Sequence, residues 1–117
     1  VVDDEKMIRQ LIAKYAVFDG YEVAEAENGM QAVEMARAGG YDLIIMDIMM
    51  PVMGGLEAAH AIRTMERADS NKVPIVAISA NAFDEDRKKA LECGMDGFLS
   101  KPIVIEELIH TLQTNLK

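Results

Sequence analysis

The stretch Leu43-Ile44-Ile45-Met46-Asp47 holds four consecutive apolar residues that end at a carboxylate. A continuous apolar run of this length is typical of a β-strand covered on both faces, as in a parallel sheet between two layers of helices. A second run, Pro74-Ile75-Val76-Ala77-Ile78, ends in a similar way at the hydroxyl side chain of Ser79. These two runs predict buried strands whose carboxyl ends carry polar groups.

Amphipathic stretches alternate with these runs and predict five helices. The helices are expected at residues 7–15, 28–38, 58–65, 83–93 and 105–116, with Asn28 as a cap and Gly94 as a stop. Shorter strands are predicted at residues 1–4, 21–26 and 97–99. Five strand-then-helix units in a row predict a doubly wound α/β domain, which is one parallel sheet with helices on both faces.

Length and composition limit the other classes. The chain has 117 residues, which suits one domain, and 12 Lys and Arg against 20 Asp and Glu give a net charge of −8. We therefore expect no direct nucleic acid binding and no attraction to anionic lipid. No apolar run approaches the roughly 20 residues of a membrane span, and no signal peptide is visible, so we expect no membrane insertion and a cytoplasmic location. The chain opens at Val1 as if partway through a strand, so a first strand truncated at the N-terminus is expected.

Polar side chains follow each of the inner strands of the predicted sheet. Asp3 and Asp4 end the first strand, Asp47 and Ser79 end the two apolar runs, and Lys101 follows the last strand. Because the carboxyl ends of parallel strands meet at one edge of an open sheet, where ligands bind, we expect these groups to converge. Three carboxylates at close range need a counter-charge, and Mg²⁺ suits oxygen ligands. With Lys101 and Ser79 opposite, the Asp47 carboxylate is equipped to attack phosphorus and form an aspartyl-phosphate.

Four motifs resemble the receiver domains of response regulators in two-component signal transduction. They are VVDDE at 1–5, DIMMPVMGGL at 47–56, VAISANA at 76–82 and GFLSKP at 97–102. The resemblance covers essentially the whole chain, so residues 1–117 are interpreted as one receiver domain. It implies a flavodoxin-like sheet of five strands in the order 2-1-3-4-5, flanked by five helices.

The resemblance also implies roles for single residues. Asp47 would accept a phosphoryl group from the phosphohistidine of a histidine kinase or histidine phosphotransfer domain. The carboxylates of Asp3 and Asp4 and the backbone carbonyl of Met49 would organise Mg²⁺, and Lys101 would contact the phosphoryl oxygens. Ser79 and the aromatic ring of Phe98 would then move as a switch that controls output. No turnover of an external substrate is expected.

Two features depart from the usual pattern of the family. Gly54 stands where many relatives have Asp, and with Gly55 it predicts a more flexible loop without removing a catalytic group. Met49 places an apolar side chain near the path of an attacking water, so the lifetime of the phosphate stays open.

Three alternative functions fit the sequence less well. A haloacid dehalogenase-type phosphatase would need a second Asp at position 49, and a flavin-binding module would need a Ser/Thr/Gly-rich loop after the first strand. A receiver-like interaction module that is never phosphorylated is disfavoured by the retained acidic pair, Asp47, Ser79 and Lys101. The attached output also stays open, since the loops look most like receivers of hybrid sensor kinases but could equally precede a DNA-binding effector domain.

Overall fold

Three strands form one parallel sheet in the computed structural model, which describes residues 1–50, 52–64, 73–80 and 84–116. They are β1 (Ile44–Asp47), β2 (Ile75–Ser79) and β3 (Gly97–Ser100), in the order β1-β2-β3. The register pairs Asp47 with Ile78 and Ser79 with Ser100. The ends of the three strands therefore lie at the same edge of the sheet.

The described residues thus form three regular strands where the sequence predicted five. Val2 makes only isolated parallel bridges, to Ala26 on one side and to Met46 on the other. The backbone N–H of Ala26 donates to the carbonyl of Val1 at 2.9 Å, and that of Val2 donates to Ile45 at 2.7 Å. So few pairs do not make a regular strand. Residues 21–26, where a strand was predicted, form no regular strand for the same reason, because Val2 and its neighbours offer too few residues to build a ladder.

All five predicted helices are present. They are α1 (Lys6–Phe18), α2 (Gly29–Ala38), α3 (Gly55–Arg63), α4 (Asp84–Glu92) and α5 (Ile105–Leu116). The side chain of Asn28 caps α2 by accepting a hydrogen bond from Gln31 N–H at 3.0 Å, as expected. Gly94 follows α4 with a positive φ of 91°, as expected for a glycine that ends a helix. The predicted positions Met65 and Phe83 lie outside the described residues.

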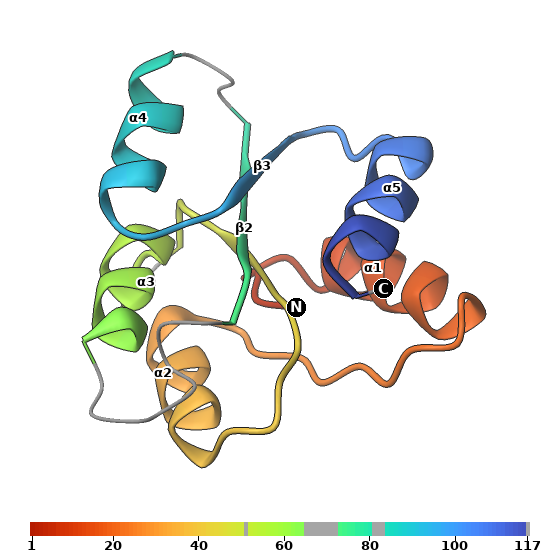
Figure 1. The fold of residues 1–117 in the computed structure, drawn as a ribbon, viewed down its shortest axis with the longest axis horizontal. Coiled ribbons are helices and arrows are strands. Elements are labelled where there is room, and N and C mark those ends of the chain that lie inside the picture. Colours follow the sequence, from red (N-terminus) through yellow and green to blue (C-terminus); the bar gives the residue numbers. More distant parts are fainter. Residues whose placement is uncertain (51, 65–72, 81–83, 117) are drawn as a thin grey trace.

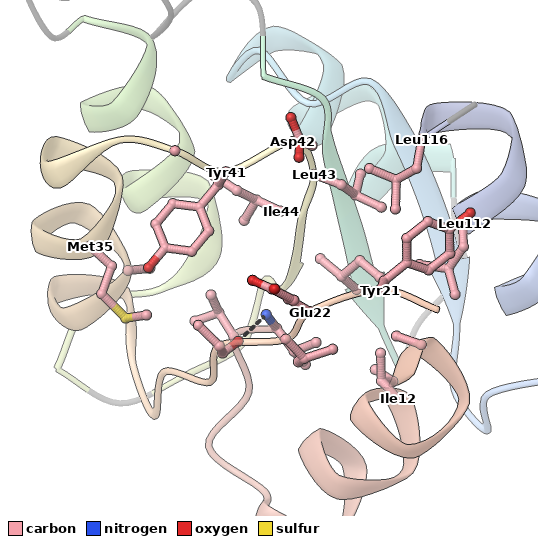
Figure 2. Close-up of a pocket in the computed structure, with 18 of the residues that line it drawn as sticks. Ile12, Tyr21, Glu22, Met35, Tyr41, Asp42, Leu43, Ile44, Leu112 and Leu116 are labelled. Atoms are coloured by element: carbon pink, nitrogen blue, oxygen red, sulfur yellow. Dashed lines mark hydrogen bonds between the residues drawn. The ribbon is translucent and has the colours of Figure 1, made fainter. Parts of the chain in front are cut away.

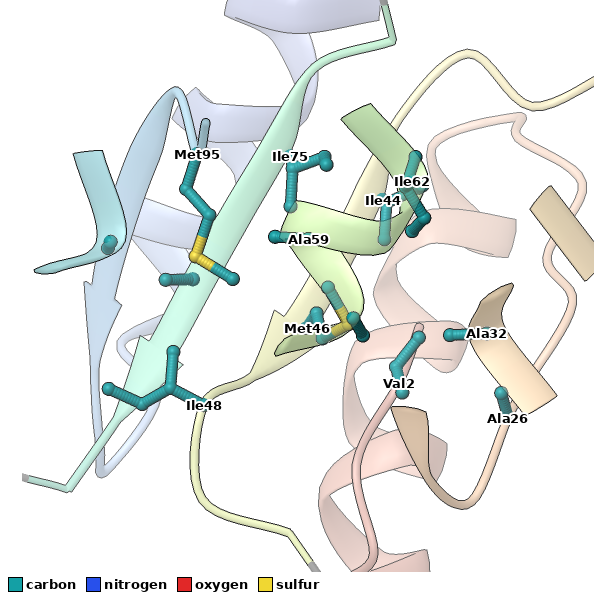
Figure 3. Packing of buried hydrophobic residues seen from close by; sticks show 13 residues of the cluster. Val2, Ala26, Ala32, Ile44, Met46, Ile48, Ala59, Ile62, Ile75 and Met95 are labelled. Carbon is teal, nitrogen blue, oxygen red and sulfur yellow. The ribbon is translucent and has the colours of Figure 1, made fainter. Parts of the chain in front are cut away.

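The helices cover the sheet on both faces (Figure 1), with α1 and α5 on one face and α2, α3 and α4 on the other. Successive residues of a strand point to opposite faces, so Met46 and Ala77 face α2 and α3 while Ile45 and Ile78 face α1 and α5. Figure 3 shows the first of these two cores around β1 and β2. The two apolar layers hold the central strands in place, so polar side chains that could act on a ligand lie at the strand ends.

Candidate functional site

Asp47 is the last residue of β1 and is 2% exposed. Its backbone N–H donates to the carbonyl of Val2 at 2.8 Å, which fixes it beside the first residues of the chain. Its Oδ1 accepts a hydrogen bond from the backbone N–H of Met49 at 3.1 Å. Its Oδ2 accepts one from Nζ of Lys101 at 2.8 Å. A buried carboxylate is thus held in one orientation at the end of a central strand.

Asp3 and Asp4 lie next to Asp47, as the sequence predicted. Asp3 is fully buried and Asp4 is exposed, and one carboxylate oxygen from each of the three aspartates lies within 4.8 Å of the others. Oδ1 of Asp3 accepts the backbone N–H of Glu5 at 2.8 Å. Oδ2 of Asp3 has no hydrogen-bond partner, although Nζ of Lys101 lies 3.4 Å away in ion-pair contact. A buried carboxylate oxygen without a donor is a group that a cation would satisfy.

Lys101 brings one positive charge to several carboxylates. Its Nζ lies 2.8 Å from Asp47 Oδ2, 3.2 Å from Glu5 Oε1 and 3.4 Å from Asp3 Oδ2. Its backbone N–H donates to the carbonyl of Ser79 at 2.9 Å, which ties the end of β3 to the end of β2. Burial alone would lower the pKa of Lys101, but the hydrogen bond and the charge of Asp47, helped by Asp3 and Glu5, outweigh it and raise the pKa. Lys101 is therefore firmly protonated.

Asp3, within this cluster, has a shifted pKa. Burial, with the charge of Asp47 added to it, raises the pKa of Asp3 to about 6, although the hydrogen bond from Glu5 N–H and the charge of Lys101 act to lower it. One lysine charge thus falls short of balancing the carboxylates around it. The carboxylates at this edge match the ligand chemistry of a hard divalent cation such as Mg²⁺.

Ser79 and Phe98, the predicted switch residues, both contact α4. Ser79 ends β2 and is 1% exposed, and its hydroxyl lies 3.4 Å from Asp86 Oδ2. The half-buried ring of Phe98 on β3 lies under the guanidinium of Arg87, with Cζ 5.1 Å from the ring centroid. Adjacent residues of α4 therefore contact one switch residue each: Asp86 contacts Ser79, and Arg87 contacts Phe98.

Gly55 has a structural role that the sequence did not reveal. A Cβ at this position would lie 2.8 Å from Cα of Ile48 and still closer to the carbonyl oxygen of Asp47. Only a residue without a side chain lets the start of α3 approach the backbone of Asp47 so closely. The expected effect of Gly54 and Gly55 on loop flexibility stays a prediction.

Four contacting residues were missed from the sequence. Glu5 binds Lys101, Arg9 donates to the carbonyl of Asp3 at 2.7 Å, and Asp86 and Arg87 contact the switch residues. Glu5 could have been found, because it directly follows the acidic pair. The other three depend on which way a helix turns its side chains, which spacing along the strands does not reveal.

A cavity of about 440 Å³ lies away from this cluster (Figure 2). Its wall includes Ile12 and Leu112 from the α1 and α5 layer, Met35 from α2, and Leu43 from the approach to β1. None of the aspartates of the cluster, nor Ser79 or Lys101, lines it. Of the three strands, only the start of β1 lines it, through Ile44 and Ile45, whereas the cluster lies at the strand ends.

No helix within the described ranges is both long and apolar enough to cross a membrane. The family model for the response regulator receiver domain matches residues 1–113. Hybrid signal transduction histidine kinase I of Dictyostelium discoideum is 35% identical over 121 residues, which cover 99% of this chain and 7% of that protein. The chain therefore spans only a small part of that relative.

Solved structures share the fold over nearly the whole chain. The chemotaxis protein CheY4 of Vibrio cholerae has a TM-score of 0.90 and 35% identity, covering 98% of this chain and 94% of that one. The receiver domain of sensor histidine kinase PA1611 from Pseudomonas aeruginosa PAO1 has a TM-score of 0.88 and 37% identity, covering 97% and 92%. In that receiver a magnesium ion is coordinated in the active site cleft. With its acidic strand ends and its family match, the chain belongs to the response regulator receiver domain family.

Proposed function

We propose that this domain accepts a phosphoryl group on Asp47 in a two-component or phosphorelay system. The donor is the phosphohistidine of a histidine kinase or of a histidine phosphotransfer domain. The observation that carries the proposal is a buried Asp47 carboxylate, oriented by Lys101 and Met49 N–H, beside the acidic pair. A fixed carboxylate with a cation at 2.8 Å is the arrangement that an attack on phosphorus requires.

In the proposed step a carboxylate oxygen of Asp47 attacks the phosphorus atom. The new O–P bond forms as the N–P bond of the phosphohistidine breaks, and the electron pair of that bond leaves with the imidazole of the partner. Lys101, which stays protonated, shifts from the carboxylate to the oxygens of the transferred group and stabilises their charge. Water later attacks the phosphorus of the aspartyl-phosphate, the O–P bond to Asp47 breaks, and inorganic phosphate leaves while Asp47 returns to its carboxylate. The domain turns over no external substrate in this scheme.

Asp3, Asp4 and Asp47 are the residues that would hold Mg²⁺, with the backbone carbonyl of Met49 as a further ligand. Two observations support this assignment: Oδ2 of Asp3 has no hydrogen-bond partner, and one oxygen from each of the three carboxylates lies within 4.8 Å of the others. Asp3, which is fully buried, would act directly or through water, and Asp4 faces solvent. When bound, the cation supplies positive charge to the oxygens of the transferred phosphoryl group.

The signal is proposed to leave the site through Ser79 and Phe98. A phosphoryl group on Asp47 offers new acceptors to the Ser79 hydroxyl, which now lies 3.4 Å from Asp86. As Ser79 moves, Phe98 turns inward from beneath Arg87. Both changes alter contacts of α4, so the output surface is α4, β3 and α5. The phosphoryl group favours the state in which it gains hydrogen bonds.

The finer fold and the cellular context belong to the same proposal. Five strands in the order 2-1-3-4-5 are supported by the bridges of Val2 to Ala26 on one side and to Met46 on the other. We expect a cytoplasmic protein, with any effector domain elsewhere in the full-length chain. The alternative function is a receiver-like interaction module that is never phosphorylated.

Incubation with acetyl phosphate, with and without Mg²⁺, separates these two functions. We expect intact-mass spectrometry to show one added phosphoryl group on the wild type only when Mg²⁺ is present, and none on Asp47→Ala. An undiminished adduct on Asp47→Ala would refute the proposal. If acetyl phosphate gives no adduct, a phosphohistidine-bearing phosphotransfer domain replaces it as the donor. Failure with both donors would leave the interaction module as the function.

A further inference from the structure

Arg9 is the buried cation of α1. It is 8% exposed, and its neighbours Ile12 and Ala16 on the same helix face are buried core residues. Its Nη1 donates to the backbone carbonyl of Asp3 at 2.7 Å, and its Nε lies 3.2 Å from Oε1 of Glu25. A guanidinium at such a place is stable only where acceptors satisfy it, and Asp3 and Glu25 are those acceptors.

The hydrogen bond from Arg9 is one of three that hold Asp3 in place. The backbone N–H of Asp3 donates to Ala26 at 3.2 Å, its carbonyl accepts Arg9, and its Oδ1 accepts Glu5 N–H. Only Oδ2 is left without a hydrogen-bond partner. Arg9 therefore orients the backbone that carries the carboxylate without occupying the oxygen that faces the cluster. Lys101, by contrast, lies beside that oxygen.

We propose that Arg9 is a positioning residue for the metal-binding carboxylates, acting through the carbonyl of Asp3, with Glu25 orienting the guanidinium. This inference rests on the proposed binding of Mg²⁺. Mg²⁺ demands near-ideal octahedral geometry at short distances. A small displacement of the Asp3-Asp4 backbone therefore strongly weakens the binding of Mg²⁺. Residues that orient metal ligands typically change the affinity 10- to 100-fold when they are removed.

A purely structural role for Arg9 makes a different prediction. In that case the bonds to Asp3 and Glu25 tie α1 to the rest of the chain and affect only the free energy of unfolding. The affinity of the folded molecules for Mg²⁺ would then be unchanged. Arg63 offers a matched control, because it donates from Nε to the carbonyl of Gly94 at 2.9 Å and from Nη2 to Asp96 at 2.7 Å. It thus makes the same two kinds of bond elsewhere in the fold.

The test is isothermal titration of Mg²⁺ into the wild type, Arg9→Met, Arg9→Lys and Arg63→Met, with the folded fraction checked by circular dichroism. We expect Arg9→Met to weaken Mg²⁺ binding by about tenfold or more. Arg9→Lys, which can still reach one acceptor, should recover part of the affinity, and Arg63→Met should match the wild type. If Arg9→Met does not fold, a several-fold loss in Arg9→Lys and in Glu25→Gln supports the proposal.

Three results would overturn the proposal, each for a different reason. Wild-type affinity in every folded variant at Arg9 and Glu25 refutes the positioning role and leaves the proposed function intact. No Mg²⁺ binding by the wild type removes the basis of both. An equal loss in Arg63→Met would also refute the role, because it would trace the effect to general destabilisation.

Discussion

The pH dependence of stability in the metal-free domain should reveal the uncompensated charge at Asp3. Its pKa rises from an ordinary 3.8 to about 6, mainly through burial. The folded state then holds this proton more tightly than the unfolded state does. The stability that the group contributes is therefore fully present below about pH 4 and is lost as the pH rises through about 6.

The structure sets the size of this effect. A rise in the pKa from 3.8 to about 6 corresponds to about 3 kcal/mol in full. Between about pH 4.5 and about pH 7.5 the contribution of Asp3 to the free energy of unfolding falls by about 2 kcal/mol. Because solvent near the strand ends screens part of this effect, we expect a change of about 1.5 kcal/mol. Asp3→Asn removes the titrating group and keeps an acceptor for Glu5 N–H. The difference in unfolding free energy between wild type and variant isolates Asp3 from the other carboxylates.

Urea unfolding in EDTA, followed by far-ultraviolet circular dichroism, measures this difference at both pH values. We expect Asp3→Asn to gain about 1.5 kcal/mol on the wild type as the pH rises from about 4.5 to about 7.5. Saturating Mg²⁺ at the higher pH should stabilise the wild type and not the variant, because binding to the folded state adds to its stability. Parallel pH profiles for the two proteins would refute the assignment of buried, uncompensated charge to Asp3.

Substitutions at three further positions test the ion pair, the packing and the helix cap. Lys101→Met leaves Asp47 without its partner and should lower the unfolding free energy in EDTA by about 3–5 kcal/mol at neutral pH; a loss below about 1 kcal/mol would contradict the ion pair's role. Gly55→Ala forces a Cβ against the backbone of Asp47 and should cost about 1–3 kcal/mol by urea unfolding, so an unchanged midpoint would contradict the packing described. Asn28→Ala should cost about 1 kcal/mol through the lost cap of α2, whereas Asn28→Ser should be nearly neutral; equal losses in both would contradict the capping role.

Much of the fold was predictable because its signals are local. The continuous apolar runs predicted β1 and β2, and helical spacing with Asn28 and Gly94 as boundaries predicted the helices. Residues 21–26, where a strand was expected, are not a regular strand, because a strand also needs a partner along its length. Val2 and its immediate neighbours provide that partner only near Ala26. The alternation of apolar and polar residues within one segment does not show whether such a partner exists.

The site was predictable as far as parallel topology determines it. Strand ends meet at one edge, so Asp3, Asp47 and Lys101 were expected together. In the structure, Nζ of Lys101 lies 3.4 Å from Asp3 Oδ2 and 2.8 Å from Asp47 Oδ2. Arg9 was missed because arginine side chains are mostly exposed, so a buried one is not the ordinary expectation. Its spacing of three residues from Ile12 was the available signal that it lies on the buried face of α1.

The most direct test of the central claim is to locate the phosphoryl group on the chain. After incubation with acetyl phosphate and Mg²⁺, borohydride reduction converts an aspartyl-phosphate into homoserine, which tandem mass spectrometry of the digested protein assigns to one position. We predict homoserine at position 47 alone, and only when Mg²⁺ was present during phosphorylation. Homoserine at position 3 or 4, or at position 47 regardless of Mg²⁺, would contradict the claim that Asp47 is the acceptor in a cation-dependent site.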